Sequence, residues 1–182
     1  MALNREKILD TALDLLCRFG LADLSMRRLA SELGVAPGAL YYHVANKQEL
    51  LSSLANRLLA HLDTSRSLQG PSDLLRQGQA LYQLLIPVKE SAEVLRLALA
   101  YRGLKDQVFP LRQQLTLAFA RLAPAGQEEL AAEVFLHTCL SLMEQTQTQA
   151  LLAGQLPADQ PDSSYQQALS AIIKGFTDPD KG

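Results

Sequence analysis

Apolar residues recur with helical spacing near the start of the chain. On one face of a predicted helix over residues 5–19 lie Ile8, Ala12, Leu16 and Phe19. The apolar spacing stops at Gly20, a residue that commonly ends helices because it adopts the left-handed conformation without a steric cost. The pattern therefore predicts a first helix that ends at Phe19.

Two short helices joined by a tight turn are predicted next. Ser25 can cap the second helix, and Gly34 suits its left-handed end. Pro37 suits the first turn of the third helix, where its missing N–H loses no partner. The positions expected to face inward are Leu29, Ala30, Leu33, Leu40 and Val44. The outer edge of the third helix is then Ala39, Tyr41, Tyr42 and His43.

A fourth helix, over residues 47–63, is predicted to connect two domains. Asn46, with Glu49 three residues later, resembles a capping box at its start. Its apolar positions are Leu50, Leu51, Leu54, Ala55, Leu58, Leu59 and Leu62. This face is wider than the ~100° stripe of a helix that packs on one partner. We therefore expect an N-terminal domain over residues 1–50 and a second domain over residues 51–182.

The rest of the chain also favours helices. The polar stretch over residues 64–72 is the expected joint, and prolines separate the helical patterns that follow it. These are predicted over residues 74–89, 92–102, 111–122, 127–153 and 164–176. No strand pattern competes with them, so the expected fold class is all-α.

Composition narrows the class of protein without pointing to a partner. The 182 residues are 48% hydrophobic, but no apolar stretch reaches the ~20 residues that span a bilayer. Charged residues near the N-terminus exclude a signal-peptide core, so we expect a cytoplasmic protein. Cys17 and Cys139 lie in apolar helical patterns, which favours buried thiols over a disulfide or a metal site. No cofactor is expected.

Overall charge gives no argument for nucleic acid, because the net charge is −2. The first fifty residues are neutral, with Arg5, Lys7, Arg18, Arg27, Arg28 and Lys47 balanced by Glu6, Asp10, Asp14, Asp23, Glu32 and Glu49. The placement of the charges is more informative than their sum. The acids at 6, 10 and 14 lie opposite the apolar face of the first helix, whereas Arg27, Arg28 and Lys47 lie near predicted helix starts.

The three-helix frame and its exposed third helix are typical of a helix-turn-helix domain, which inserts such a helix into a DNA groove. Four ordered blocks sharpen this interpretation: residues 24–30 (LSMRRLA), 33–35 (LGV), 38–44 (GALYYHV) and 46–51 (NKQELL). Together they resemble the TetR family of regulators, from about Arg5 to Leu54. The resemblance implies a homodimer that binds palindromic operator DNA and is released by a small molecule.

The resemblance also assigns DNA-binding roles to matching residues. Arg27 would bind a base and Lys47 a phosphate; Tyr41 and His43 would contact the backbone, and Tyr42 a base edge or an apolar group. The full candidate set is Ser25, Arg27, Arg28, Pro37, Ala39, Tyr41, Tyr42, His43 and Lys47. Arg27 and Arg28 are adjacent on a helix and cannot point the same way, so one of them is expected to be merely solvated. The two tyrosines have half-buried core positions as their alternative.

The second domain is assigned by analogy to ligand binding and dimerisation. An apolar stripe on the last helix, with a broad face on the long helix before it, suits a dimer interface, and a pair of core helices in a monomer is the alternative. The stripe is Tyr165, Leu169, Ile172, Ile173 and Phe176, and the broad face is Leu130, Val134, Phe135, Thr138 and Leu142. Candidates for a ligand pocket are His61, Tyr82, Arg96, Tyr101, Phe119, His137, Ser141 and Glu144. For His137, Ser141 and Glu144, a solvated helix face is the competing interpretation.

The expected function is a ligand-responsive transcriptional regulator, most simply a repressor, with activation as an open alternative. An enzyme is not expected, because the histidines at 43, 61 and 137 share no spacing and no nucleophile or metal cluster accompanies them. The other class left open is a ligand-sequestering or protein-binding module that has kept the fold without binding operator DNA.

Overall fold

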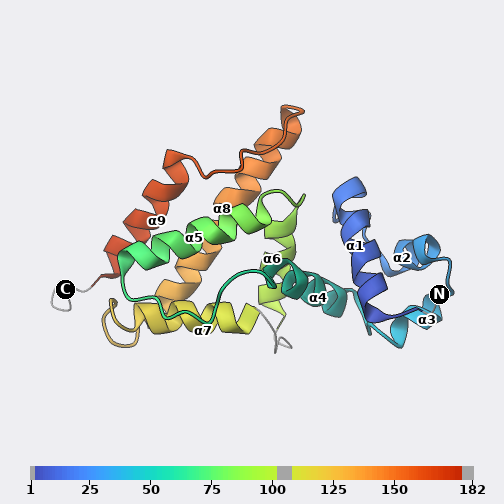
Figure 1. The fold of residues 1–182 in the computed structure, drawn as a ribbon, viewed down its shortest axis with the longest axis horizontal. Helices are drawn as coiled ribbons and strands as arrows, with labels where there is room; N and C mark the ends of the chain where they lie inside the picture. Colours follow the sequence, from blue (N-terminus) through green and yellow to red (C-terminus); the bar gives the residue numbers. More distant parts are fainter. Residues whose placement is uncertain (1–2, 102–107, 178–182) are drawn as a thin grey trace.

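The structure is a computed structural model that describes residues 3–101 and 108–177. Over these residues the chain forms α-helices and no strand, as the sequence predicts. The helices are α1 (Arg5–Phe19), α2 (Met26–Leu33), α3 (Pro37–Tyr41), α4 (Lys47–Leu59), α5 (Pro71–Leu85), α6 (Ser91–Ala100), α7 (Val108–Phe119), α8 (Glu128–Leu152) and α9 (Ser163–Phe176). Figure 1 shows α1–α3 as a separate head at one end, joined through α4 to a larger body formed by α5–α9.

Local signals in the sequence set the helices of the head. Ser25 caps α2, where its hydroxyl accepts a hydrogen bond from the N–H of Arg28 at 3.2 Å. Gly34 ends α2 with a φ of 66°, and Pro37 is the first residue of α3. The amide oxygen of Asn46 accepts from the N–H of Glu49 at 2.8 Å and starts α4. The predicted caps of the second and fourth helices are therefore confirmed.

Helix α4 connects the head to the body, as its wide apolar face predicts. It packs on α1 in the head and on α5, α6 and α7 in the body. Its buried residues are Leu50, Leu51, Ser52, Ser53, Leu54, Ala55, Leu58 and Leu59. A displacement of α6 would therefore shift α4, which also packs on the head.

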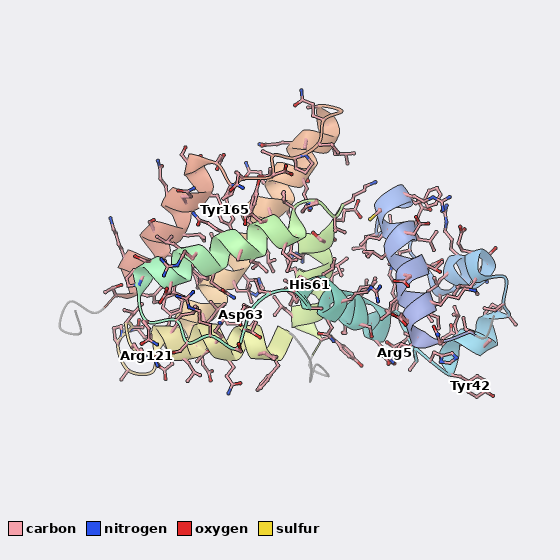
Figure 2. The ribbon with its side chains drawn as sticks, viewed as in Figure 1. Arg5, Tyr42, His61, Asp63, Arg121 and Tyr165 are labelled. Atoms are coloured by element: carbon pink, nitrogen blue, oxygen red, sulfur yellow. The ribbon has the colours of Figure 1, made fainter. Side chains whose placement is uncertain are left out.

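The core of the body depends on a close crossing at Gly78 of α5. A Cβ on this glycine would lie 2.5 Å from Cδ1 of Leu169 and 3.3 Å from the ring of Phe135. The hydroxyl of Tyr165 on α9 donates to the carbonyl oxygen of Gly78 at 2.9 Å. Figure 2 shows Tyr165 beside α5. Because Gly78 has no side chain, α5 can approach α8 and α9 at van der Waals distance.

Several predicted helix boundaries are wrong, and two of the errors come from prolines at helix starts. Pro71 and Pro110 were expected to separate helices, but α5 begins at Pro71, and Pro110 lies in the first turn of α7. A proline is tolerated there because the first N–H groups of a helix have no intrahelical partner. Helix α5 ends at Leu85, before Pro87, and α7 ends at Phe119 rather than at residue 122. Helix α6 ends at Ala100; the predicted end at Arg102 lies outside the described residues.

Most of the apolar stripe on α9 is buried inside the body of the same chain. Tyr165, Leu169 and Ile173 are almost fully buried in the body, and Phe135, predicted on the broad face of α8, is buried as well. Helical periodicity identified an apolar face correctly but not the surface that covers it. A dimer interface on the stripe is therefore wrong for these three residues.

Two further expectations need correction. Cys139 is buried, but Cys17 is exposed on α1. The joint before α5 is tied to the body: Gln114 of α7 donates to the carbonyl of Arg66 at 2.7 Å, and Arg121 donates to that of Leu68 at 3.0 Å.

None of the described helices combines the length and the apolar character that a membrane crossing requires.

Candidate nucleic-acid interface

The most exposed aromatic side chains of the head lie at the end of α3. Tyr42 is 92% exposed and Tyr41 is 52% exposed. Leu40, the residue before them, is fully buried in the core, and α3 packs on α2. Figure 2 shows Tyr42 at the outer edge of the head, away from the body. The alternative of two half-buried core tyrosines is therefore excluded for Tyr42.

The adjacent arginines of α2 have different surroundings. Arg28 forms an ion pair with Asp23 at 2.7 Å and stacks on the ring of Phe19, with its guanidinium carbon 3.9 Å from the ring centre. Arg27 is exposed and has no ion pair or hydrogen bond to another described side chain. As expected, the two point in different directions, and Arg27 is the one whose guanidinium is available to a partner.

The other DNA-binding candidates of the head differ in exposure. Ser25 is exposed at the start of α2, and Pro37 is exposed at the start of α3. Ala39 and His43 are half-buried. Lys47, at the start of α4, is half-buried, and its ammonium group donates to the carbonyl of Leu21 at 3.4 Å.

Arg5 holds the end of α3 in place, a role that the sequence analysis missed. Its guanidinium donates to the carbonyl oxygen of His43 at 2.9 Å, to the carboxylate of Glu49 at 3.1 Å and to the hydroxyl of Ser53 at 2.6 Å. Glu49 also accepts from the N–H of Ala45 at 2.8 Å. That backbone hydrogen bond, with the charge of Arg5, lowers the pKa of the Glu49 carboxyl. The three contacts of Arg5 each span more than 35 residues of sequence, so no local signal could have revealed them.

Among the described residues, the ligand-pocket candidates differ in burial and in surroundings. Tyr82 and Phe119 are buried, with Tyr82 donating to the carbonyl of Ala158 at 3.0 Å and Phe119 packed edge-on against Phe135. Exposed candidates are His61, Arg96, Tyr101, His137 and Ser141. Figure 2 shows His61 where α4 reaches the body.

One pair among these candidates does come together. Arg96 of α6 donates to the half-buried Glu144 of α8 at 2.9 Å. His137 lies 3.4 Å from Glu133, one helical turn away from it. A groove of about 350 Å³ between α7 and α8 is lined by other residues, including Phe109, Leu117 and Ala132.

The described residues offer little for metal or nucleophilic chemistry. They contain no group of three or more His, Cys, Asp or Glu side chains arranged to hold a metal ion. Burial raises the pKa of the Cys139 thiol to about 12, which disfavours the reactive thiolate.

A three-helix head with two short helices around a tight turn, and an exposed aromatic edge on the second of them, defines the class of helix-turn-helix proteins. Residues 8–54, which span the head and the first half of α4, match the family model described as bacterial regulatory proteins, tetR family.

Relatives and solved structures agree with this assignment. The class D tetracycline repressor protein of Escherichia coli is 46% identical over 71 residues, which cover 38% of this chain but only 33% of that protein. The fold match is much longer. BioQ of Mycobacterium smegmatis is 28% identical, with a TM-score of 0.82 over 95% of this chain and 97% of BioQ. BioQ crystallised with its natural double-stranded DNA operator superposes with a TM-score of 0.79, at 28% identity over 96% of this chain and 98% of that one.

Proposed function

We propose that this chain is a transcriptional regulator, most simply a repressor, which binds a palindromic DNA operator as a homodimer and is released by a small molecule. The observation that carries the proposal is the exposed end of α3, where Tyr42 is 92% exposed on a fully packed head. A large aromatic side chain that is solvent-exposed gains free energy when it is buried in a groove. The structural similarity to BioQ, which was crystallised with its DNA operator, supports this choice.

Within the interface, we assign base recognition to Arg27 and Tyr42. An unpaired guanidinium can donate two parallel hydrogen bonds to a guanine edge in the major groove. Tyr41, His43, Lys47 and the N–H groups at the start of α2, beside Ser25, would bind phosphates and position the head. Pro37 and Ala39 would lie close to the bases, and their small side chains would determine how closely α3 approaches them. Arg28 takes no part, because Asp23 and Phe19 already hold it.

For dimerisation, we propose the outward face of α8. This face is opposite the buried side of the helix and carries Leu130, Val134, His137, Ser141 and Leu152. Leu130 and Leu152 are 57% and 82% exposed and lie equal numbers of residues before and after Ser141. If two copies of α8 pair antiparallel about Ser141, Leu130 of one copy meets Leu152 of the other. A two-fold interface requires this self-complementarity.

Leu152→Lys is expected to separate the dimer. Burial of a leucine contributes about 1.5–3 kcal/mol, and the change removes two such contacts per dimer. The dissociation constant should therefore rise by about 100-fold or more, measured by analytical ultracentrifugation. The matched control is Leu156→Lys, because Leu156 is 93% exposed but lies past the end of α8. An unchanged dimer in the Leu152 variant would contradict pairing through this face.

The two-domain division places the DNA-binding unit in residues 1–50 and the effector-binding unit in residues 51–182, with α4 between them. Because α4 packs on both α1 and α6, an effector that shifts α6 can move the head. Binding of DNA and of effector would then oppose each other, each weakening the other by the same factor. For the effector site, the Arg96–Glu144 pair is the candidate that the structure supports best.

The experiment that tests the proposal is selection of bound duplexes from a random DNA pool by the purified protein at physiological salt. Enrichment of a palindrome is the expected result. No enrichment by a folded dimer would instead favour the ligand-sequestering or protein-binding module. One observation favours that alternative: Arg5, Arg18 and Arg28 in the head are all ion-paired with acidic residues of the same chain.

A further inference from the structure

The head and the body make a polar contact outside α4, between two helix ends. The contact joins Gly20 and Leu21, which follow α1, to Glu90, which precedes α6. The N–H of Leu21 donates to the carboxylate of Glu90. Figure 1 shows the C-terminal end of α1 facing the corner between α5 and α6. Beside this contact, the thiol of Cys17 lies against the backbone of Lys89.

The backbone conformation of Gly20 and its lack of a side chain allow this contact. Its φ is 87°, a conformation that other residues rarely adopt. A Cβ at this position would lie 2.8 Å from one carboxylate oxygen of Glu90 and 3.1 Å from the other. Any side chain here would push the carboxylate away, so the absence of a side chain allows the two corners to meet.

Glu90 adopts an unfavourable backbone conformation at the contact. It is the one non-glycine residue with positive φ, at 55°, among residues 3–101 and 108–177. Such a conformation costs free energy in a residue with a Cβ, and it persists where the surroundings compensate for it. Glu90 is also the N-cap residue of α6, yet its side chain does not cap α6. Its carboxylate binds the head instead.

The same corner of the head is linked to the start of α4. While the N–H of Leu21 donates to Glu90, its carbonyl oxygen accepts from the ammonium group of Lys47 at 3.4 Å. Leu21 therefore connects the body to the residue that we assign to a DNA phosphate. A head joined to the body through α4 alone could rotate about that helix, whereas a second attachment fixes its angle.

We propose that Glu90 is a positioning residue that fixes the angle between head and body, and so sets the spacing of the two heads on DNA. The proposal rests on the proposed operator binding for its effect on DNA, but the angle itself is a property of the free protein. A shift of the corner between α5 and α6 would reach the head through Glu90 as well as through α4.

The first test measures the angle without DNA. Spin labels attached through Ser31→Cys in the head and Gln155→Cys in the body, with Cys17→Ser, report the distance between the two units. Labelled protein is diluted with unlabelled protein so that only distances within one chain are measured. Glu90→Ala should broaden a narrow distance distribution, while Glu90→Gln, which keeps an acceptor oxygen, should restore it. Glu93→Ala removes the same charge from α6 without contacting the head and is the matched control.

The second test measures spacing on DNA. The wild-type protein should lose at least tenfold in affinity when the selected half-sites are moved by one base pair, and Glu90→Ala should lose less than threefold. An unchanged distance distribution in Glu90→Ala would overturn the proposal, and so would a broadened distribution with wild-type spacing preference. If the wild-type protein binds no duplex, the proposed function fails, while a broadened distribution would still support Glu90 as the residue that positions the head.

Discussion

Arg27→Ala is expected to weaken binding to the selected duplex by about 5- to 150-fold and to relax the sequence preference at one base of each half-site. The range corresponds to the 1–3 kcal/mol that a base-specific arginine contributes. The structure supports this choice because the guanidinium of Arg27 is exposed and has no ion pair to another described residue. Fluorescence anisotropy titrations against the selected duplex and its single-base variants would measure both effects.

Arg28→Ala is the matched control, because it removes the same charge from the next position of α2. Its guanidinium is held by Asp23 and by the ring of Phe19, contacts that together contribute about 1 kcal/mol to stability at an exposed site. The affinity of this variant should change by less than about threefold at constant salt. If Arg28→Ala and Arg27→Ala weaken binding equally and without sequence dependence, Arg27 contributes only charge.

Phe119→Ala is expected to lower the free energy of unfolding by about 3–5 kcal/mol. The ring is fully buried and packs edge-on against Phe135 and Phe176, with ring centres 5.9 Å and 6.3 Å away. Urea denaturation followed by circular dichroism measures the change. Leu117→Ala, two residues earlier on α7, is the control: Leu117 is 57% exposed, and its loss should cost less than about 1 kcal/mol.

This prediction also distinguishes two roles for Phe119. The residue type makes Phe119 a candidate for a ligand pocket, whereas in the structure it packs against the rings of Phe135 and Phe176. Truncating a side chain that lines an open pocket would lower the free energy of unfolding much less, because fewer contacts are lost. A loss below about 1 kcal/mol would therefore contradict the packed core and favour the pocket.

The head could be predicted well from sequence because its signals act over a few residues. Ser25, Gly34, Pro37 and Asn46 each determine the backbone within one turn of their own position. The same rule also explains the errors at Pro71 and Pro110. A proline is compatible with both a break and a helix start, and the sequence around it did not distinguish between them.

Contacts between distant segments could not be predicted from the sequence. Periodicity marks the stripe on α9 as apolar, but its burial against α5 and α8 depends on how the helices pack. Among the pocket candidates, Arg96 and Glu144 are 48 residues apart in the sequence, yet their side chains form a hydrogen bond. Glu90 gave no signal either, because its carboxylate accepts a hydrogen bond from Leu21, which lies 69 residues away in the sequence.

If two heads bind one face of a palindromic duplex, the affinity depends on the spacing between its half-sites. Two recognition helices would enter successive major grooves about 34–36 Å apart, or 10–10.5 base pairs. Inserting about five base pairs, half of that repeat, turns one half-site to the opposite face of the duplex. We predict that the affinity for the selected duplex then falls to that for random DNA. Equal affinity for both duplexes would contradict binding by two fixed heads.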